Sequence, residues 1–255
     1  MRLCRVEIDG LAQYGVVADD RIELLVGDPY HGPASSGVAV PLAGARLLPP
    51  VTPSKILAVG TNYRAHAVEM GKGVPDEPLL FLKAPSALLA PGDAIVRPGG
   101  YERVDFEGEL AFVIGKRARH VRAADALDYV LGYTIMNDVT VRDLQQKDGQ
   151  FTRAKGFDTF APCGPWLETS LDPARLRLTT RVNGAVQQSS STDDLIFSVP
   201  ELVAFASRVM TLEPGDLFST GTPQGVGQLW PGDVVEVEIA GIGTLSNPVV
   251  AEVLP

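Results

Sequence analysis

The sequence predicts a mixed, β-rich α+β fold with short helices and a small N-terminal β subdomain. Turn signals are frequent, apolar segments are short, and few stretches have helical periodicity. Strand and helix patterns do not alternate along the chain, which argues against a βαβ architecture. A chain of 255 residues is long enough for one large domain with a small appendage.

The N-terminal fifty residues have the pattern of short strands joined by turns. Apolar or alternating segments are separated by Asp-Gly and Asp-Asp turn signals. The proline-rich segment 47–53 is typical of a connector. We therefore predict an N-terminal β subdomain at residues 1–50 and a larger domain at residues 51–255. The strands expected in the subdomain cover residues 3–8, 14–18 and 21–25.

Short helices are expected at several places in the larger domain. Asn62 is the expected N-cap of the first helix, and Gly71 is its expected C-cap. Ser198 and Glu201 have the spacing of a capping box at the start of the last helix. The expected helices cover residues 63–70, 123–130, 141–146 and 198–209.

The rest of the larger domain is expected to be mostly strand. Asn183-Gly184 is a hairpin signal between strands at residues 178–182 and 185–188. Pro-Gly-Asp recurs as a tight-turn signal, because proline sets the first turn dihedral and glycine accepts the positive one. These turns are expected at residues 91–93, 214–216 and 231–233.

Composition argues against several classes of partner. The net charge is −9, so the chain has no basic footprint for nucleic acid and no attraction to anionic membranes. No apolar segment approaches transmembrane length, and residues 1–7 lack the apolar core of a signal peptide. Cys4 and Cys163 do not form a metal-binding spacing. We expect a reduced, cytoplasmic protein.

Two glutamates, Glu107 and Glu109, stand where a buried strand is expected to begin. In a strand, residues i and i+2 point to the same face, so the two carboxylates repel each other and lose hydration. A hard divalent cation is the simplest compensation. The alternative is a strand whose polar end is solvated, which is the commoner explanation of a single Glu-x-Glu pattern.

A third acid, Asp138, ends a second apolar segment at residues 133–139. Three carboxylates without cysteine or clustered histidine favour magnesium, manganese or calcium over zinc. We therefore predict one divalent cation, with Mg²⁺ first and Mn²⁺ or Ca²⁺ as alternatives, held by Glu107, Glu109 and Asp138.

Three further side chains are candidates for chemistry. His66 and Glu69 lie three residues apart in the first expected helix, so they share a face and can form a dyad for proton transfer. The alternative is an ordinary surface pair. Lys155 lies between a polar segment and a Pro/Gly loop. Beside a metal it can stabilise a developing oxyanion; otherwise it is a solvated loop lysine.

Several segments, in order along the chain, resemble the catalytic domain of the fumarylacetoacetate hydrolase family. Each motif is weak alone, but the ordered set is specific, and the resemblance runs from about residue 54 to residue 249. The segments are residues 56–69 (ILAVGTNYRAHAVE), 107–110 (EGEL), 137–145 (NDVTVRDLQ), 154–158 (AKGFD) and 220–227 (TGTPQGVG).

The resemblance implies a β-roll core, a homodimer, and a dyad on a mobile lid. It also implies a role for each candidate residue, and no departure from the family pattern occurs at these positions. The implied metal ligands are Glu107, Glu109 and Asp138, the lid dyad is His66 and Glu69, the oxyanion partner is Lys155, and the substrate contacts are Gln145 and Thr222.

Relatives in this family cleave carbon–carbon bonds in acylpyruvates, decarboxylate oxaloacetate, or isomerise diacids such as 2-hydroxyhepta-2,4-diene-1,7-dioate and 5-carboxymethyl-2-hydroxymuconate. In each case a 2-oxo acid chelates the metal, which stabilises the enolate. Because His66 and Glu69 supply a base for water, we favour a hydrolase acting on an acylpyruvate-like diketo acid. Isomerase and decarboxylase activities stay open, as does a non-catalytic ligand-binding domain that kept the fold.

Overall fold

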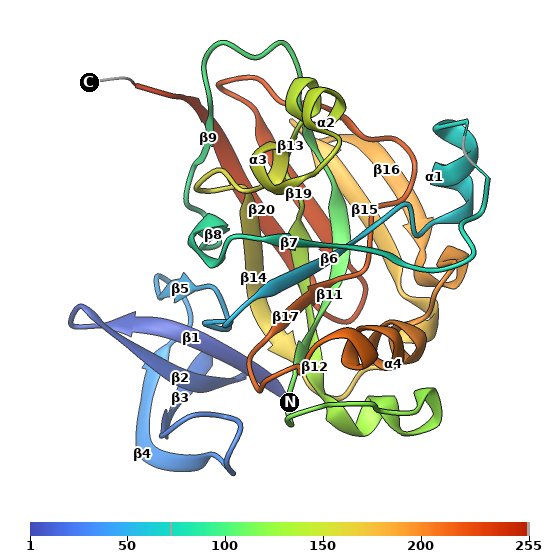
Figure 1. Cartoon of the computed structure of the whole chain (residues 1–255). Helices are drawn as coiled ribbons and strands as arrows, with labels where there is room; N and C mark the ends of the chain where they lie inside the picture. The colour runs from blue at the N-terminus through green and yellow to red at the C-terminus, as the bar shows by residue number, and fades with distance from the viewer. Residues whose placement is uncertain (72, 254–255) are drawn as a thin grey trace.

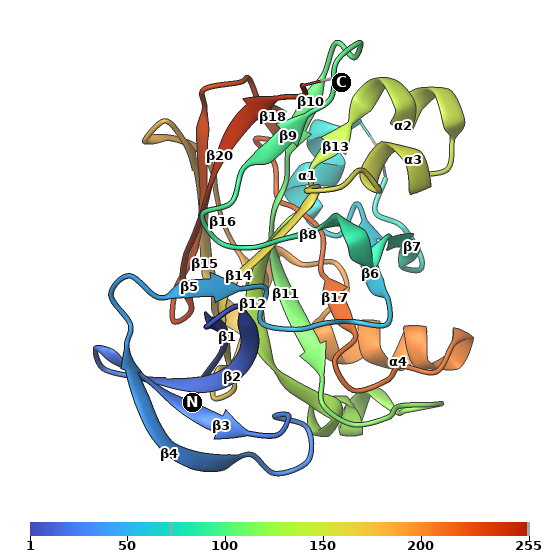
Figure 2. The ribbon, with the colours of Figure 1, turned by 90° about the vertical axis from the view of Figure 1, so that its left-hand side faces the viewer.

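Strands dominate the computed structural model, which describes residues 1–71 and 73–253. The prediction of a β-rich α+β fold with short helices is confirmed (Figure 1). The N-terminal strands lie at one end of the molecule, whereas α1, α2 and α3 lie toward the other end (Figures 1 and 2). Among the described residues, no helix is long and apolar enough to cross a membrane.

The largest sheet extends across the molecule in the order β4-β3-β2-β1-β14-β12-β11-β17-β6-β7, with β5 paired to β1 and β8 to β14. Its pairs are antiparallel except β6 with β17 and β8 with β14. Its strands are β1 (Arg2–Ile8), β2 (Leu11–Ala18), β3 (Arg21–Val26), β4 (Ala34–Pro41), β5 (Arg46–Leu48), β6 (Ile56–Gly60), β7 (Leu79–Lys83), β8 (Leu88–Leu89), β11 (Gly108–Ile114), β12 (Val130–Asn137), β14 (Ala161–Glu168) and β17 (Leu217–Ser219).

Two smaller sheets complete the strand structure. One has the order β16-β15-β19-β20-β9 and the other β13-β10-β18. The predicted hairpin at Asn183-Gly184 is confirmed, since both residues have the positive φ that a tight hairpin turn requires, 52° and 79°. These strands are β9 (Ile95–Arg97), β10 (Val104–Phe106), β13 (Thr140–Val141), β15 (Arg177–Val182), β16 (Ala185–Ser191), β18 (Gly227–Gln228), β19 (Val234–Ile239) and β20 (Gly243–Ala251).

The helices are short and lie at the ends of strands. The start of α4 is as predicted, because the Glu201 carboxylate accepts hydrogen bonds from the Ser198 amide at 2.7 Å and from its hydroxyl at 2.6 Å. The α-helices are α1 (Arg64–Glu69), α2 (Arg142–Asp148), α3 (Thr152–Lys155) and α4 (Val199–Val209); the 3₁₀ turns are η1 (Pro85–Ala87), η2 (Ala123–Tyr129), η3 (Pro173–Arg175) and η4 (Thr192–Asp194).

Two local predictions were wrong. The helix expected at residues 123–130 is the 3₁₀ segment η2, in which Ala126 is the buried residue. One small buried side chain does not stabilise an α-helix of this length.

Asn62 does not cap α1. Its side-chain amide donates to the carbonyls of Phe197 at 3.0 Å and Thr220 at 2.8 Å, and its oxygen accepts from the Phe197 amide at 2.8 Å. Asn62 therefore joins the end of β6 to two distant segments.

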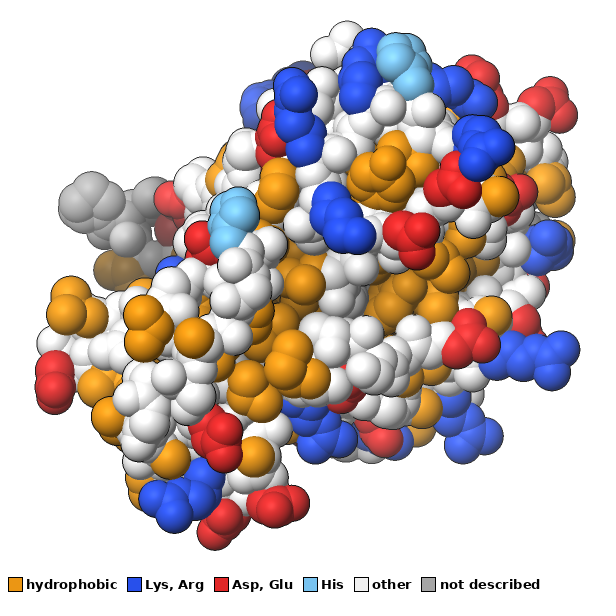
Figure 3. Space-filling model, turned by 90° about the horizontal axis from the view of Figure 1, so that it is seen from below, with side chains coloured by type: hydrophobic (Ala, Val, Ile, Leu, Met, Phe, Trp, Pro, Cys, Tyr) orange, Lys and Arg blue, Asp and Glu red, His pale blue; other side chains and the backbone are white. Residues whose placement is uncertain are grey.

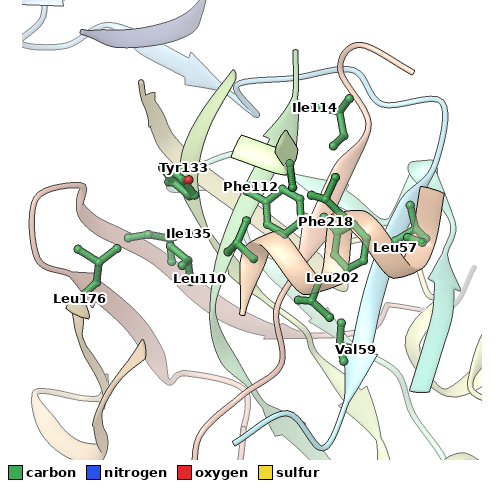
Figure 4. Close-up of a cluster of buried hydrophobic side chains, with 14 of the residues drawn as sticks. Leu57, Val59, Leu110, Phe112, Ile114, Tyr133, Ile135, Leu176, Leu202 and Phe218 are labelled. Atoms are coloured by element: carbon green, nitrogen blue, oxygen red, sulfur yellow. The ribbon is translucent and has the colours of Figure 1, made fainter. Parts of the chain in front are cut away.

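The main hydrophobic cluster surrounds β11, which is buried along its whole length. The rings of Phe112 and Phe218 are stacked with centroids 4.8 Å apart, and Leu202 of α4 lies beside them (Figure 4). The strands β15 and β19 also pack on β11. The strand β11 is thus closely packed along its whole length.

The N-terminal strands extend the large sheet through β1, whose Leu3 pairs with Leu167 of β14. The boundary after residue 50 stays a prediction.

The face at the bottom of Figure 1 carries a band of apolar side chains (Figure 3). Surfaces of this kind often take part in protein–protein contacts, and the predicted homodimer is not tested by a single chain.

The stacked phenylalanines give a test of this core. Phe218→Ala should lower the free energy of unfolding by about 3–5 kcal/mol, because it removes a fully buried ring and leaves a cavity. The matched control Leu11→Ala truncates a side chain that is 67% exposed and should change it by less than about 0.5 kcal/mol. Denaturant unfolding measures both. Equal losses in the two variants would contradict the assignment of Phe218 to the core.

Candidate metal centre and active site

A cavity of about 350 Å³ lies among the ends of β6, β7 and β11 and the helices α1, α2 and α3. Most of the candidate residues line it; Glu69 and Asp138 lie one hydrogen bond behind its wall, on His66 and Lys155. The structure therefore brings together side chains that are far apart in the sequence. The candidates that line the cavity are His66, Glu107, Glu109, Gln145, Lys155 and Thr222.

Three buried carboxylates meet at the floor of this cavity. Oxygen atoms of Glu107, Glu109 and Asp138 lie within 4.8 Å of one another. Strand pairing produces this meeting, because β11 and β12 are antiparallel neighbours and the start of one lies beside the end of the other. The Asp138 amide donates to the Glu107 carbonyl at 2.8 Å, which fixes the junction.

The end of β17 and the loop after it hold the carboxylate of Glu109 in place. Glu109 accepts hydrogen bonds from the Ser219 hydroxyl and from the Gly221 amide, the latter at 2.8 Å. Gly221 has a φ of +95°, and a Cβ there would lie 2.9 Å from Cβ of Asn62. At Gly225 a Cβ would lie 2.3 Å from the carbonyl oxygen of Gln187 in β16. The glycines of this loop therefore permit close backbone approach.

Buried cations surround the carboxylates. The Lys155 ammonium donates to Glu107 at 2.7 Å, to Asp138 at 2.6 Å and to the Thr140 hydroxyl at 2.8 Å. The Lys83 ammonium donates to the other oxygen of Asp138 at 2.5 Å. Lys155 is thus the end of α3 and not a solvated loop lysine.

Sequence reasoning missed Lys83 and Arg142 as parts of the site. Arg142 donates to Glu107 at 2.6 Å and to Asp105 at 2.8 Å. Arg142 lies within a segment that carried the family resemblance. Lys83 is the last residue of β7, and the other four residues of that strand are apolar. A charged residue at the end of such a strand was the available signal.

The site shifts the pKa values of Glu109 and Glu107 in opposite directions. Burial, and then repulsion by Asp138 and Glu107, raise the pKa of Glu109 well above its usual value. Burial also opposes ionisation of Glu107, but Arg142 and Lys155 outweigh it and hold the pKa of Glu107 well below its usual value. Among the described residues, Glu109 accepts hydrogen bonds from Ser219 and Gly221 but from no cationic side chain.

The three acids fit a divalent cation. All of the donor atoms are carboxylate oxygens, which hard cations such as Mg²⁺, Mn²⁺ and Ca²⁺ prefer. A cation among them would offset the repulsion that disfavours ionised Glu109. A divalent metal site is therefore consistent with the geometry, and magnesium stays the prediction.

His66 and Glu69 form the predicted pair at the side of the cavity. His66 Nδ1 lies 2.8 Å from Glu69 Oε2, and Glu69 Oε1 accepts from the Gly225 amide at 3.1 Å. When the carboxylate accepts a proton from Nδ1, the unprotonated nitrogen of the neutral ring is Nε2. His66 is buried and lines the cavity, whereas the Glu69 side chain is 39% exposed, so the pair connects the cavity wall with the surface.

The two predicted substrate contacts also line the cavity, and both bond to protein. The Gln145 side-chain oxygen accepts from Arg142 at 2.8 Å. The Thr222 hydroxyl donates to the Gly108 carbonyl at 3.0 Å and accepts from Gln188 at 2.8 Å. The single O–H donor of Thr222 is thus taken, so a hydrogen bond from its hydroxyl to substrate would require this bond to break, and both contacts stay predictions.

Replacing one acid separates metal binding from stability. Glu109→Gln should weaken Mg²⁺ binding at least about 10-fold, because a neutral amide replaces a ligand. The same change should raise the melting temperature of the metal-free protein, because it removes a carboxyl group whose pKa is raised by burial and then by Asp138 and Glu107, while the amide oxygen still accepts from Gly221. Calorimetry and thermal unfolding measure these effects, and Glu213→Gln is the surface control. Unchanged metal affinity would remove Glu109 from the site.

Comparison with known proteins agrees with this geometry. The fumarylacetoacetate (FAA) hydrolase C-terminal model matches residues 55–250, and the Rv2993c-like N-terminal model matches residues 1–50. The chain is 46% identical over 217 residues to oxaloacetate tautomerase fahd2, mitochondrial, of Xenopus laevis, covering 80% of this chain and 68% of that protein.

Two solved structures extend the comparison to the whole fold. A 2-hydroxyhepta-2,4-diene-1,7-dioate isomerase from Mycobacterium marinum is 45% identical with a TM-score of 0.93, covering 99% of each chain. A maleylpyruvate hydrolase from Sphingobium is 35% identical with a TM-score of 0.83, covering 99% of this chain and 100% of that one. The match over most of the chain, on a fold that carries the acids and lysine together, shows that this protein belongs to the fumarylacetoacetate hydrolase family of enzymes.

Proposed function

We propose that the protein catalyses a divalent-metal-dependent proton transfer on a small 2-oxo acid, interconverting keto and enol forms or moving a double bond. The observation that carries this proposal is the position of His66, which lines the same cavity as Glu107 and Glu109. A base and a cation site thus face one small volume. The names of the tautomerase and isomerase relatives at 45–46% identity support the same reaction class.

The residues of the chain divide the work of such a reaction. A bound cation would chelate the carboxylate and keto oxygen of the substrate and stabilise the negative charge of its enolate. Nε2 of His66 takes the proton from the carbon next to the keto group, while Glu69 orients the ring. Lys155 lies beside Glu107 and Asp138, where its charge stabilises an enolate oxygen.

The site works in a largely apolar enclosure. Phe81 and Phe151 line the cavity with their rings edge to face at 5.2 Å, and the Lys155 ammonium lies 5.0 Å from the centre of the Phe81 ring. An apolar wall excludes water and strengthens the interaction of Lys155 with developing negative charge.

Hydrolytic carbon–carbon cleavage of a diketo acid is the second candidate, and it is the reaction favoured by the sequence. It requires the same enolate and one additional activated water. The dyad is compatible with it, because Glu69 holds Nδ1 of His66 and leaves Nε2 free to take a proton from water as well as from carbon. The likeness to a maleylpyruvate hydrolase supports it at lower identity, 35%. Decarboxylation, by contrast, makes no use of a base.

One substrate panel distinguishes these reactions. Mg²⁺-loaded protein is given oxaloacetate, an acylpyruvate and an unsaturated seven-carbon diacid in heavy-oxygen water. Enol–keto conversion without fragmentation selects the tautomerase or isomerase, whereas label in a released acid selects the hydrolase, and carbon dioxide without label selects the decarboxylase. Turnover of none of these substrates, with metal bound, would overturn the proposed function.

The dyad can be tested apart from the metal. Glu69→Gln should lower turnover roughly 100-fold, because a neutral amide no longer stabilises the positive charge of the His66 ring that has taken up a proton. Mg²⁺ affinity should hold, since Glu69 is outside the carboxylate cluster. The matched control is Glu77→Gln, an exposed acid on the segment after α1. Near-normal turnover of Glu69→Gln would reduce the pair to a structural feature.

A further inference from the structure

The cations of the cavity wall differ in how many donor atoms they have left. Lys155 uses its ammonium on Glu107, Asp138 and Thr140. Each nitrogen of the Arg142 guanidinium already donates to a protein group: Nε to Asp105, Nη1 to Gln145 and Nη2 to Glu107. Among the described residues these bonds use all three donors of Lys155 and three of the five donors of Arg142.

Arg103 is different. Its Nε donates to the two oxygens of Asp105 at 2.9 and 3.1 Å, and within residues 1–71 and 73–253 its two terminal nitrogens make no hydrogen bond. Its side chain is 53% exposed and lines the cavity. Arg103 therefore places an unused guanidinium edge at the rim of the site.

The backbone and side chain of Arg103 are both held. Its amide donates to the Asp143 carboxylate at 3.0 Å, and its carbonyl accepts from the Arg142 amide at 2.9 Å. Asp105, which is fully buried, holds the guanidinium from behind. A guanidinium fixed in this way loses little entropy when it binds a carboxylate through its free edge.

A chain of alternating charges joins the metal centre to this rim. Glu107 contacts Arg142, Arg142 contacts Asp105, and Asp105 contacts Arg103. The cavity between has room for a small acid, and of the Lys and Arg side chains described in its wall, Arg103 alone has both terminal nitrogens without a hydrogen bond. The nearby acid Glu69 does not occupy the free edge of Arg103, because both of its oxygens already accept hydrogen bonds, from His66 and Gly225.

Resting on the proposed function, we propose that Arg103 is a specificity-determining residue that binds the second carboxylate of a dicarboxylic 2-oxo acid. The first carboxylate and the keto oxygen take the metal end of the cavity, and the free edge of Arg103 pairs with the carboxylate at the other end. A monocarboxylic 2-oxo acid of the same length leaves this edge unpaired.

Displacement of labelled oxalate from Mg²⁺-loaded protein tests the proposal. Oxalate occupies the metal end alone, and two matched pairs compete for it: oxaloacetate with 2-oxobutyrate, and 2-oxoglutarate with 2-oxovalerate. Each pair differs in a terminal carboxylate against a methyl group. Wild-type protein should bind the diacid of at least one pair about 10-fold or more tightly than its monoacid.

Three variants complete the design. Arg103→Met should abolish the preference for the diacid while oxalate and monoacid affinities hold, because Asp105 stays paired with Arg142. Arg103→Lys should keep part of the preference, since the charge remains but the planar fork is lost. Arg117→Met removes an exposed arginine that pairs with Glu213 and should match wild type.

The outcomes distinguish this inference from the proposed function. If wild-type protein has no diacid preference, or if Arg103→Met weakens oxalate and diacid equally, Arg103 does not select the second carboxylate. If oxalate fails to bind wild-type protein in the presence of metal, the proposed function fails first and this inference fails with it.

Discussion

Burial of three like charges at one point is the constraint on which the rest of the site depends. Glu107, Glu109 and Asp138 are almost wholly removed from water, and buried charges persist only when other charges compensate them. Lys83 and Lys155 compensate Asp138, and Arg142 with Lys155 compensates Glu107. The described residues thus supply hydrogen-bonded cations for two of the acids, whereas Glu109 accepts hydrogen bonds only from Ser219 and Gly221. That asymmetry is a reason for a metal to bind here.

The fold meets this constraint with rigid backbone. Glu107 directly precedes β11, Glu109 is its second residue, and Asp138 directly follows β12, within a sheet that is packed on both faces. Their mutual distances are therefore set by strand pairing, which loop motion does not alter. The base is held differently: α1 has six residues, and its Val68 is 78% exposed. Short, sparsely packed segments of this kind open more easily than core strands.

Features that depend on residues close in sequence could be predicted, whereas features that depend on residues far apart in sequence could not. The hairpin at Asn183-Gly184 and the start of α4 depend on neighbours in sequence, so local chemistry predicted them. The pairing of Glu107 and Glu109 was predicted from the period of a strand, and Asp138 from its place at the end of a second apolar segment. The roles of Asn62 and Lys83 were missed, because their partners are more than fifty residues away. The burial of Lys155 likewise could not be predicted from the sequence, since α3 has only four residues and its position depends on the whole fold.

The choice between isomerisation and hydrolysis depends more on α1 than on the metal centre. Both reactions need the same acids, the same lysine and the same enolate, so the carboxylate cluster does not separate them. They differ in whether the base faces carbon or a water molecule, and in whether water can enter. The helix α1 carries His66, and Met70, which directly follows α1, is part of the cavity wall. One element therefore sets both the position of the base and the access of water, and small changes in its seating can redirect the chemistry of an otherwise fixed site.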